Sequence, residues 1–114
     1  MDQYQHQLDR TFLALGDPTR RAVLRRLGRG AASVSDLAAP FEMALPSFIK
    51  HIRFLEESGL IRTQKQGRVR TCTLDKVRLA AAESWLAEQR TLWEERTDRL
   101  EQFVTSFQET GQES

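Results

Sequence analysis

The stretch from Ser33 to Leu60, SVSDLAAPFEMALPSFIKHIRFLEESGL, decides the fold. Ser33 and Asp36 have the spacing of a helix capping box, with Asp36 in place of the usual glutamate, and the short helix that follows is predicted to end near Phe41. A second helix is predicted over 44–58, with Pro46 in its first turn, where a missing N–H costs nothing. Two helices joined by so short a connection are typical of a helix-turn-helix.

The predicted helix over 44–58 is amphipathic in sequence. Phe48, Ile52 and Leu55 recur on one side, which is expected to face a core. Gly59 ends the helix, and Leu60 is expected to fold back onto Leu55 in the hydrophobic contact of a Schellman ending. The polar residues of this helix are therefore expected on its outer side.

The segments before this stretch predict two more helices. Apolar residues recur at helical spacing over about 5–15: Leu8, Phe12 and Leu15. Asp17 then supplies an N-cap carboxylate, and Pro18 occupies the first turn of the next helix. Gly28 and Gly30 are expected to end that helix through left-handed backbone conformations.

The segments after this stretch predict a hairpin and one long helix. Residues that favour strands, with a turn glycine at Gly67, predict a β-hairpin over 60–74. Asp75 can cap the following helix, and no glycine or proline interrupts the chain from Lys76 to about Gln108.

The long helix carries a narrow apolar stripe. Five apolar residues recur every seven positions: Leu79, Leu86, Trp93, Leu100 and Phe107. Phe103 and Val104 add to the stripe and widen it towards the end of the helix. A helix of roughly 30 residues is about 45 Å long, more than the width of so small a domain, so part of the stripe needs a partner. A homodimer is therefore expected, with these interface residues: Leu8, Phe12, Leu86, Trp93, Leu100, Phe103 and Phe107.

Length and composition limit the class of protein. The 114 residues suffice for one domain, predicted over 1–108, with a polar tail over 109–114. No apolar run approaches the roughly 20 residues that span a membrane, and the polar start of the chain resembles no signal peptide, so a cytoplasmic location without membrane contact is expected. The net charge of +1 gives no argument for nucleic acid, but basic residues predominate between positions 10 and 70.

The predicted order of elements is that of a winged helix-turn-helix: a mainly α fold with a β-hairpin wing and dimerisation helices at both ends. Such a fold presents the helix over 44–58 to the major groove of double-stranded DNA, and the hairpin over 60–74 to the backbone or minor groove. The candidate DNA-binding residues are polar or cationic residues of these two elements: Ser47, Lys50, His51, Arg53, Lys65, Gln66, Arg68 and Arg70.

Several stretches together resemble the ArsR-type bacterial repressors over about residues 8–108. The matching stretches are Leu15-Gly-Asp-Pro-Thr-Arg-Arg21, Ser33-Val-Ser-Asp-Leu37, Leu45-Pro46, Lys50-His51, Leu55-Glu-Glu-Ser-Gly-Leu60 and Gly67-Arg68. The resemblance implies a repressor that binds an inverted-repeat operator as a homodimer, in the subgroup that lacks a metal site.

The chain departs from this family pattern at two positions and lacks its metal ligands. Ala44 replaces the common serine cap and forfeits about 1 kcal/mol, and Ile49 replaces a serine hydroxyl with an apolar side chain that could meet a thymine methyl. Ser33-Val-Ser35 stands where thiolate-type members place Cys-x-Cys, and the last helix contains no histidine. No metal and no cofactor are therefore expected.

The sequence is also compatible with other interpretations. The single cysteine, Cys72, is either a redox switch activated by Arg70 or a small packed hydrophobe. Trp85 and Trp93 either pack or border a pocket for a small-molecule effector. The fold could also serve as a protein–protein interaction module. An enzyme is disfavoured, because the chain has no phosphate loop, G-x-S-x-G or H-E-x-x-H motif.

Overall fold

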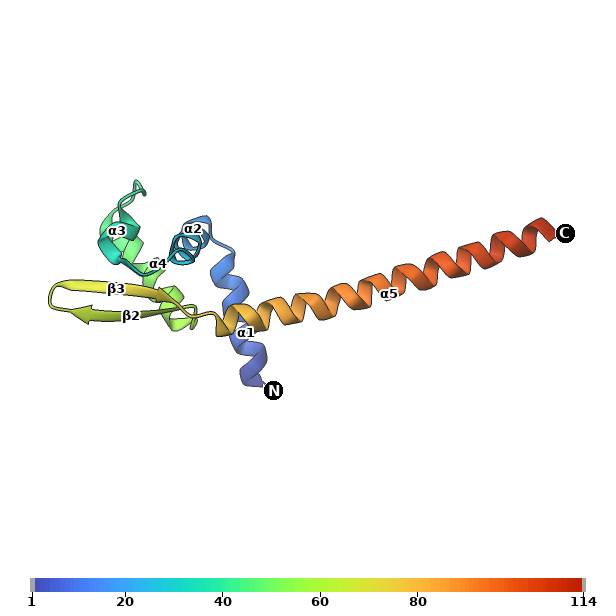
Figure 1. Ribbon diagram of the computed structural model, residues 1–114, viewed down its shortest axis with the longest axis horizontal. Coiled ribbons are helices and arrows are strands. Elements are labelled where there is room, and N and C mark those ends of the chain that lie inside the picture. Colours follow the sequence, from blue (N-terminus) through green and yellow to red (C-terminus); the bar gives the residue numbers. More distant parts are fainter. Residues whose placement is uncertain (1, 114) are drawn as a thin grey trace. The chain divides into compact units, whose positions relative to one another are not determined.

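A computed structural model describes residues 2–113, with side chains for residues 3–107. It contains five helices and three strands: α1 (Asp2–Leu15), α2 (Pro18–Leu27), β1 (Ala32–Ser33), α3 (Val34–Ala38), α4 (Leu45–Glu57), β2 (Ile61–Gln66), β3 (Val69–Leu74) and α5 (Val77–Glu113) (Figure 1). The chain divides into two units, Met1–Ala82 and Glu83–Ser114. The predicted mainly α fold with a β-hairpin wing is confirmed.

Local caps define the helix-turn-helix as predicted. The Ser33 hydroxyl accepts a hydrogen bond from the backbone N–H of Asp36 at 3.1 Å and so starts α3. Ala44 precedes α4 in an extended conformation with no side-chain cap, and its backbone carbonyl accepts from the N–H groups of Ser47 and Phe48. Helix α3 ends at Ala38, earlier than the predicted Phe41.

Helix α4 ends in the predicted Schellman motif. Gly59 has a φ of 77°, in the left-handed region that favours glycine. The backbone N–H of Leu60 bonds to the carbonyl of Leu55, and that of Gly59 to the carbonyl of Glu56, each at 3.0 Å. Leu55 and Leu60 are both fully buried, so this ending also fixes the direction in which the chain enters the hairpin.

The core of the first unit lies between α4, the hairpin and α2. Its largest fully buried side chains include Phe48 and Leu55 of α4 and Ile61 of β2. Burial of each such apolar side chain contributes roughly 1.5–3 kcal/mol. Because Phe48, Ile52 and Leu55 occupy one side of α4, as predicted, the opposite side of that helix is left at the surface.

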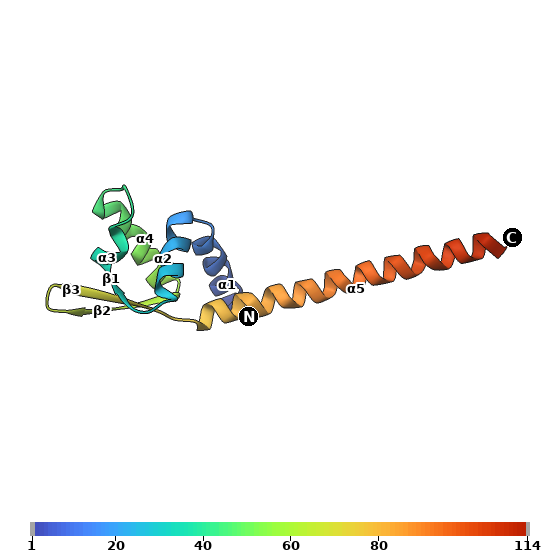
Figure 2. The same cartoon turned by 45° about the horizontal axis from the view of Figure 1, so that its top comes forward.

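The hairpin is part of a three-stranded antiparallel sheet with the order β1-β3-β2. The short strand β1 was not predicted; its Ala32 pairs with Cys72 of β3. Gly67 and Arg68 form a two-residue turn in which Gly67 has a φ of 62° and Arg68 does not have positive φ, the pattern of a type II′ turn. In both views the turn projects beyond the neighbouring helices (Figures 1 and 2).

The first two helices differ from prediction in their ends. Helix α1 begins at Asp2 rather than near residue 5. Helix α2 begins at Pro18, and the Asp17 carboxylate accepts from the backbone N–H of Arg20 at 3.0 Å, as predicted. Gly28 is right-handed, with a φ of −61°, so the expectation that it adopts a left-handed conformation was wrong; Gly30 has a positive φ, 138°.

Helix α5 is continuous and longer than predicted. The Asp75 carboxylate accepts from the backbone N–H of Val77 at 3.1 Å and so marks its start. The backbone helix reaches Glu113, so the predicted end near Gln108 was too early, and the side chains of the predicted polar tail 109–114 lie outside the described residues. No helix in the described part of the chain is long and apolar enough to cross a membrane.

Candidate nucleic-acid interface

The outer side of α4 carries three of the four candidate residues predicted for this helix. Ser47, Lys50 and Arg53 are exposed there, opposite the buried Phe48, Ile52 and Leu55. Pro46 and Ser47 stand in the first turn of the helix, and Arg53 in its second half. The surface therefore offers a hydroxyl and two cations along a helix that a B-DNA major groove can admit.

The hairpin carries the other candidate residues. Lys65, Gln66, Arg68 and Arg70 are all exposed. Lys65 and Arg70 are directly paired across β2 and β3, and Arg68 lies in the turn. Three cationic side chains are thus gathered on one projecting element, as the sequence predicted for a wing.

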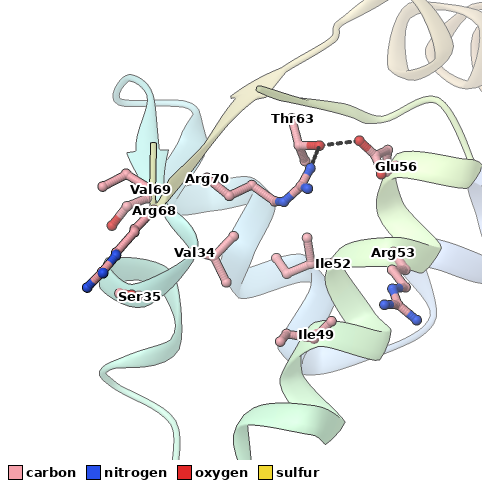
Figure 3. Close-up of a pocket in the computed structure, with 11 residues that line it drawn as sticks. Val34, Ser35, Ile49, Ile52, Arg53, Glu56, Thr63, Arg68, Val69 and Arg70 are labelled. Carbon is pink, nitrogen blue, oxygen red and sulfur yellow. Dashed lines mark hydrogen bonds between the residues drawn. The ribbon is translucent and has the colours of Figure 1, made fainter. Parts of the chain in front are cut away.

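A cleft of about 580 Å³ separates α4 from the hairpin (Figure 3). Its basic lining comes from Arg53 of α4 and from Arg68 and Arg70 of the hairpin region. Its apolar lining includes Ile49 and Ile52 of α4 and Val34 of α3. The cleft therefore joins the two predicted DNA-binding elements into one surface with guanidinium groups and an apolar floor.

A chain of hydrogen bonds crosses this cleft. Arg70 Nη1 donates to Thr63 Oγ1 at 2.9 Å, and the Thr63 hydroxyl donates to the carboxylate of Glu56 on α4 (Figure 3). Among the described residues that line the cleft, Glu56 alone is acidic. Sequence analysis missed Thr63 and Glu56, because their contact depends on how the hairpin folds over α4.

His51 is not on the outer side of α4 with the other candidates. Its Nδ1 lies 3.2 Å from Arg20 Nη1 and 3.7 Å from Asp17 Oδ2, and its side chain is 23% exposed. Burial raises the pKa of the Asp17 carboxyl, but the backbone N–H of Arg20 and the charges of His51 and Arg20 outweigh it, and the pKa is lowered. The imidazole therefore joins α4 to the start of α2.

Cys72 lacks both properties that a redox switch requires, an exposed thiol and a lowered pKa. Its side chain is fully buried in β3. Burial raises the pKa of the thiol, Glu56 adds to the rise, and Arg70 only partly opposes it. Of the two alternatives, burial and the raised pKa of the thiol favour a small packed hydrophobe over a redox switch.

The apolar stripe of α5 is exposed in the second unit. The predicted interface residues there have these exposed fractions: Leu86 45%, Trp93 56%, Leu100 63%, Phe103 69% and Phe107 73%. Leu92, at 52%, belongs to the same exposed set and was not predicted. So many exposed large apolar side chains on one helix indicate a surface that a partner covers.

The two predicted interface residues of α1 behave differently from those of α5. Leu8 is only 8% exposed, so its own unit already covers most of it, and Phe12 is half-buried. Leu13 and Tyr4 are the exposed large apolar residues of this helix, at 62% and 48%. Helical spacing alone did not separate the side of α1 that packs within the chain from the side that remains open.

Within the described residues, no three histidine, cysteine, aspartate or glutamate side chains gather in a way that could hold a metal ion. The expectation that no metal is bound stays a prediction.

Sequence comparison finds regulators of transcription. A family model described as a helix-turn-helix domain matches residues 15–64, from the end of α1 into β2. The HTH-type transcriptional regulator Rv2034 of Mycobacterium tuberculosis is 36% identical over 73 residues, 64% of this chain and 68% of that protein. The transcriptional repressor SdpR of Bacillus subtilis is 28% identical over 79 residues, 69% of this chain and 88% of that protein.

Structure comparison agrees with sequence comparison. The crystal structure of the ArsR family transcriptional regulator RHA00566 is 67% identical, with a TM-score of 0.77, and the match covers 79% of this chain and 93% of that one. The homodimeric winged helix-turn-helix DNA-binding domain Mb0332 of Mycobacterium bovis has a TM-score of 0.60 over 77% of this chain and 83% of that one. At 21% identity, this second likeness shows the fold alone.

Proposed function

Since the chain belongs to the ArsR family of transcriptional regulators, we propose that it is a homodimeric repressor that binds an inverted-repeat operator in double-stranded DNA. The relatives are transcriptional regulators with a helix-turn-helix and are not enzymes, so this chain acts as a regulator of transcription. A regulator that binds DNA acts where the DNA lies, which in a bacterium is the cytoplasm. That the chain represses transcription, rather than activates it, is supported by the repressor from Bacillus subtilis among the relatives.

The observation that carries the proposal is the basic cleft between α4 and the hairpin. Helix α4 would enter the major groove with Ser47 and Lys50 at base edges, where a hydroxyl or an ammonium group can read donors and acceptors. Ile49 lines the cleft, which Ser47 and Lys50 do not, and it can meet a thymine methyl, which would replace the polar contact that a serine makes. Arg53 extends the same side of α4 towards phosphates.

The hairpin would hold the DNA backbone that borders the groove. Lys65, Arg68 and Arg70 present charges to phosphates on an element that projects beyond the helices, and Gln66 adds a neutral hydrogen-bonding group. Phosphate contacts position a protein on DNA but carry no sequence information of their own. In this proposal α4 determines which DNA sequence is bound, and the hairpin adds affinity for DNA of any sequence.

The homodimer is supported by the exposed stripe on α5. Leu86, Trp93, Leu100, Phe103 and Phe107 present large apolar surfaces that a second copy of the helix would cover. The fold neighbour from Mycobacterium bovis is itself homodimeric. Two-fold symmetry in the protein would match two half-sites in an inverted repeat.

Selection from random DNA duplexes tests whether α4 determines the sequence preference and the hairpin only the affinity. The parent chain is expected to enrich an inverted repeat, and Ser47→Ala is expected to enrich a different sequence at the corresponding position in each half-site. Lys65→Ala should enrich the same repeat as the parent with lower affinity. Enrichment of no repeat by the parent would contradict the proposal and favour the alternative of a winged-helix protein-binding module.

A further inference from the structure

The guanidinium group of Arg20, on α2, makes polar contacts with both α1 and α4. Its Nε donates to the carbonyl of Ala14, and its Nη2 to the carbonyl of Leu13, each at 2.9 Å. Both carbonyls belong to the last turn of α1, and that of Leu13 also accepts from the backbone N–H of Gly16 at 3.1 Å. Arg20, on α2, therefore caps the C-terminal end of α1.

The same guanidinium group also contacts α4. Its Nη1 lies 3.2 Å from Nδ1 of His51, and its central carbon lies 4.4 Å from the ring centroid of Phe54. His51 and Phe54 are one turn apart on α4, at its border with α1 and α2 rather than in the cleft. A single planar group thus touches the end of one helix and one side of another.

A second cation supports this arrangement from α1. The guanidinium carbon of Arg10 lies 5.7 Å from the Phe54 ring centroid, and Arg10 Nη2 lies 3.6 Å from Glu57 Oε2. The Glu57 side chain is 66% exposed and that of Arg10 34%, so solvent screens this ion pair and it contributes little by itself. The aromatic ring of Phe54 is therefore contacted by two arginines, of which Arg20 is nearer and has more partners.

The chemistry of these contacts requires arginine at position 20. Only a guanidinium offers five N–H donors in a rigid plane that can bond to two carbonyls and still stack on an aromatic ring. A lysine would keep the charge, but its single ammonium group could not bond to both carbonyls and also stack on the ring of Phe54. The role of residue 20 is therefore geometric as well as electrostatic.

We infer that Arg20 is a positioning residue for DNA recognition, which fixes α4 relative to the C-terminal end of α1. This inference rests on the proposed function, in which α4 is the helix that reads the operator. Because α4 would have to enter the groove at one angle to use Ser47 and Lys50 together, loosening its attachment to α1 would weaken sequence-specific binding more than binding to phosphates.

Arg21 offers a matched control within the same motif. Its Nη1 donates to the carbonyl of Leu15 at 2.8 Å, so it also caps α1, and the contact described for it does not reach α4. Arg20→Met and Arg21→Met each remove one cationic cap of the same helix end. Only Arg20→Met removes the link to His51 and Phe54.

The first measurement is the distance between α1 and α4 within one chain, by pulsed electron spin resonance. Spin labels at His6→Cys and Leu45→Cys, both exposed positions, are introduced in a Cys72→Ala background, and labelled chains are diluted with unlabelled ones. The parent and Arg21→Met are expected to give one narrow distribution, and Arg20→Met a broader or displaced one. A distribution in Arg20→Met as narrow as in Arg21→Met, and centred at the same distance, would overturn the inference.

The second measurement compares binding of the unlabelled variants to the selected operator and to random DNA. Arg20→Met is expected to lose roughly tenfold in operator affinity, the scale of one specific contact, while affinity for random DNA stays within about twofold. An equal loss on both DNAs would assign Arg20 a merely structural role. Should Arg20→Met fail to fold, Phe54→Leu removes the ring, leaves the α1 cap in place and is expected to give the same two results.

The distance measurement uses no DNA. A parent chain that prefers no operator would therefore refute the proposed function while the α1–α4 distances stay as expected, whereas an Arg20→Met distribution as narrow as that of Arg21→Met and centred at the same distance would refute the inference while the parent still selects an operator.

Discussion

Arg70 Nη1 lies 2.9 Å from Thr63 Oγ1, on neighbouring strands of the hairpin, and the same hydroxyl donates to Glu56 on α4. This relationship ties the hairpin to the helix that would enter the DNA groove. It also places a carboxylate in a cleft that is otherwise basic among its described charged groups. If DNA binds here as proposed, a negative charge at this place would oppose phosphate and so would limit binding to DNA of any sequence.

Replacing Glu56 by Gln should therefore strengthen non-specific binding. Glutamine keeps an oxygen that can accept from Thr63 but removes the charge. Affinity for random duplexes is expected to rise by roughly fivefold at low salt, corresponding to about 1 kcal/mol for a charge near a protein surface, and the gain should shrink as salt is added. Fluorescence anisotropy across a salt series measures it. Glu88→Gln, on exposed α5, is the control; a gain no larger than in this control would refute the role of Glu56.

Neutralising the hairpin should weaken binding to all sequences alike. Lys65→Ala and Arg68→Ala each remove one exposed cation that would contact a phosphate, so each should reduce the slope of log affinity against log salt by about 1. The ratio of operator to random affinity should stay near that of the parent. A changed sequence preference with an unchanged salt slope would mean that the hairpin reads bases instead.

Adding a cap to α4 should stabilise the chain. Ala44 has φ −61° and ψ 141°, the extended backbone of an N-cap residue, yet makes no side-chain bond. Ala44→Ser would supply a hydroxyl that accepts from the backbone N–H of Ser47, as Ser33 does for Asp36 at the start of α3. The free energy of unfolding in urea is expected to rise by about 1 kcal/mol. Ala44→Val, which brings no hydroxyl, should not share this gain.

Truncating the stripe of α5 should dissociate the dimer without unfolding the chain. Trp93 is 56% exposed in the single chain, so Trp93→Ala removes little packing there. Loss of a large aromatic contact is expected to weaken self-association by about 2 kcal/mol or more, measured by sedimentation equilibrium. Glu94→Ala, at the neighbouring exposed position, should associate as the parent does. Equal association of all three chains would contradict an α5 interface.

The N-cap of α2 should make stability depend on acid. The pKa of Asp17 is lowered from its ordinary value of 3.8, so its contribution to stability is present at neutral pH and is lost as pH falls below that value through the folded pKa. Asp17→Asn keeps a capping oxygen but removes the charge next to Arg20 and His51. The variant is expected to unfold more easily at pH 7 and to lose less stability than the parent between pH 5 and about 2. Parallel pH profiles for the two chains would contradict this role.

Features set by neighbouring residues were the ones that sequence alone predicted well. The Ser33 cap, the Gly59 ending with Leu60 on Leu55 and the turn at Gly67 each depend on a few adjacent positions, and the structure confirms them. Strand β1 escaped prediction because two residues, Ala32 and Ser33, carry no periodicity and become a strand only by pairing with β3.

Features set by contacts between distant residues were the ones that sequence missed. His51 has the polar character of a DNA-reading side chain, yet it contacts Arg20, 31 positions earlier in the chain. Leu8 repeats with Phe12 as an interface residue would, but its own unit covers it. Spacing within one helix predicts which residues share a side of that helix. It does not predict whether that side packs on another element of the chain, on a partner or on DNA.

The decisive measurement is the binding of the parent chain to fragments of the promoter upstream of its own gene, by anisotropy, with random DNA as competitor across a salt series. The proposed function predicts tight, salt-dependent binding to a fragment that contains an inverted repeat, with two chains bound per repeat and the preference lost in a Ser47→Ala, Lys50→Ala double variant. Binding with no preference for any inverted repeat, there or among selected duplexes, would contradict it.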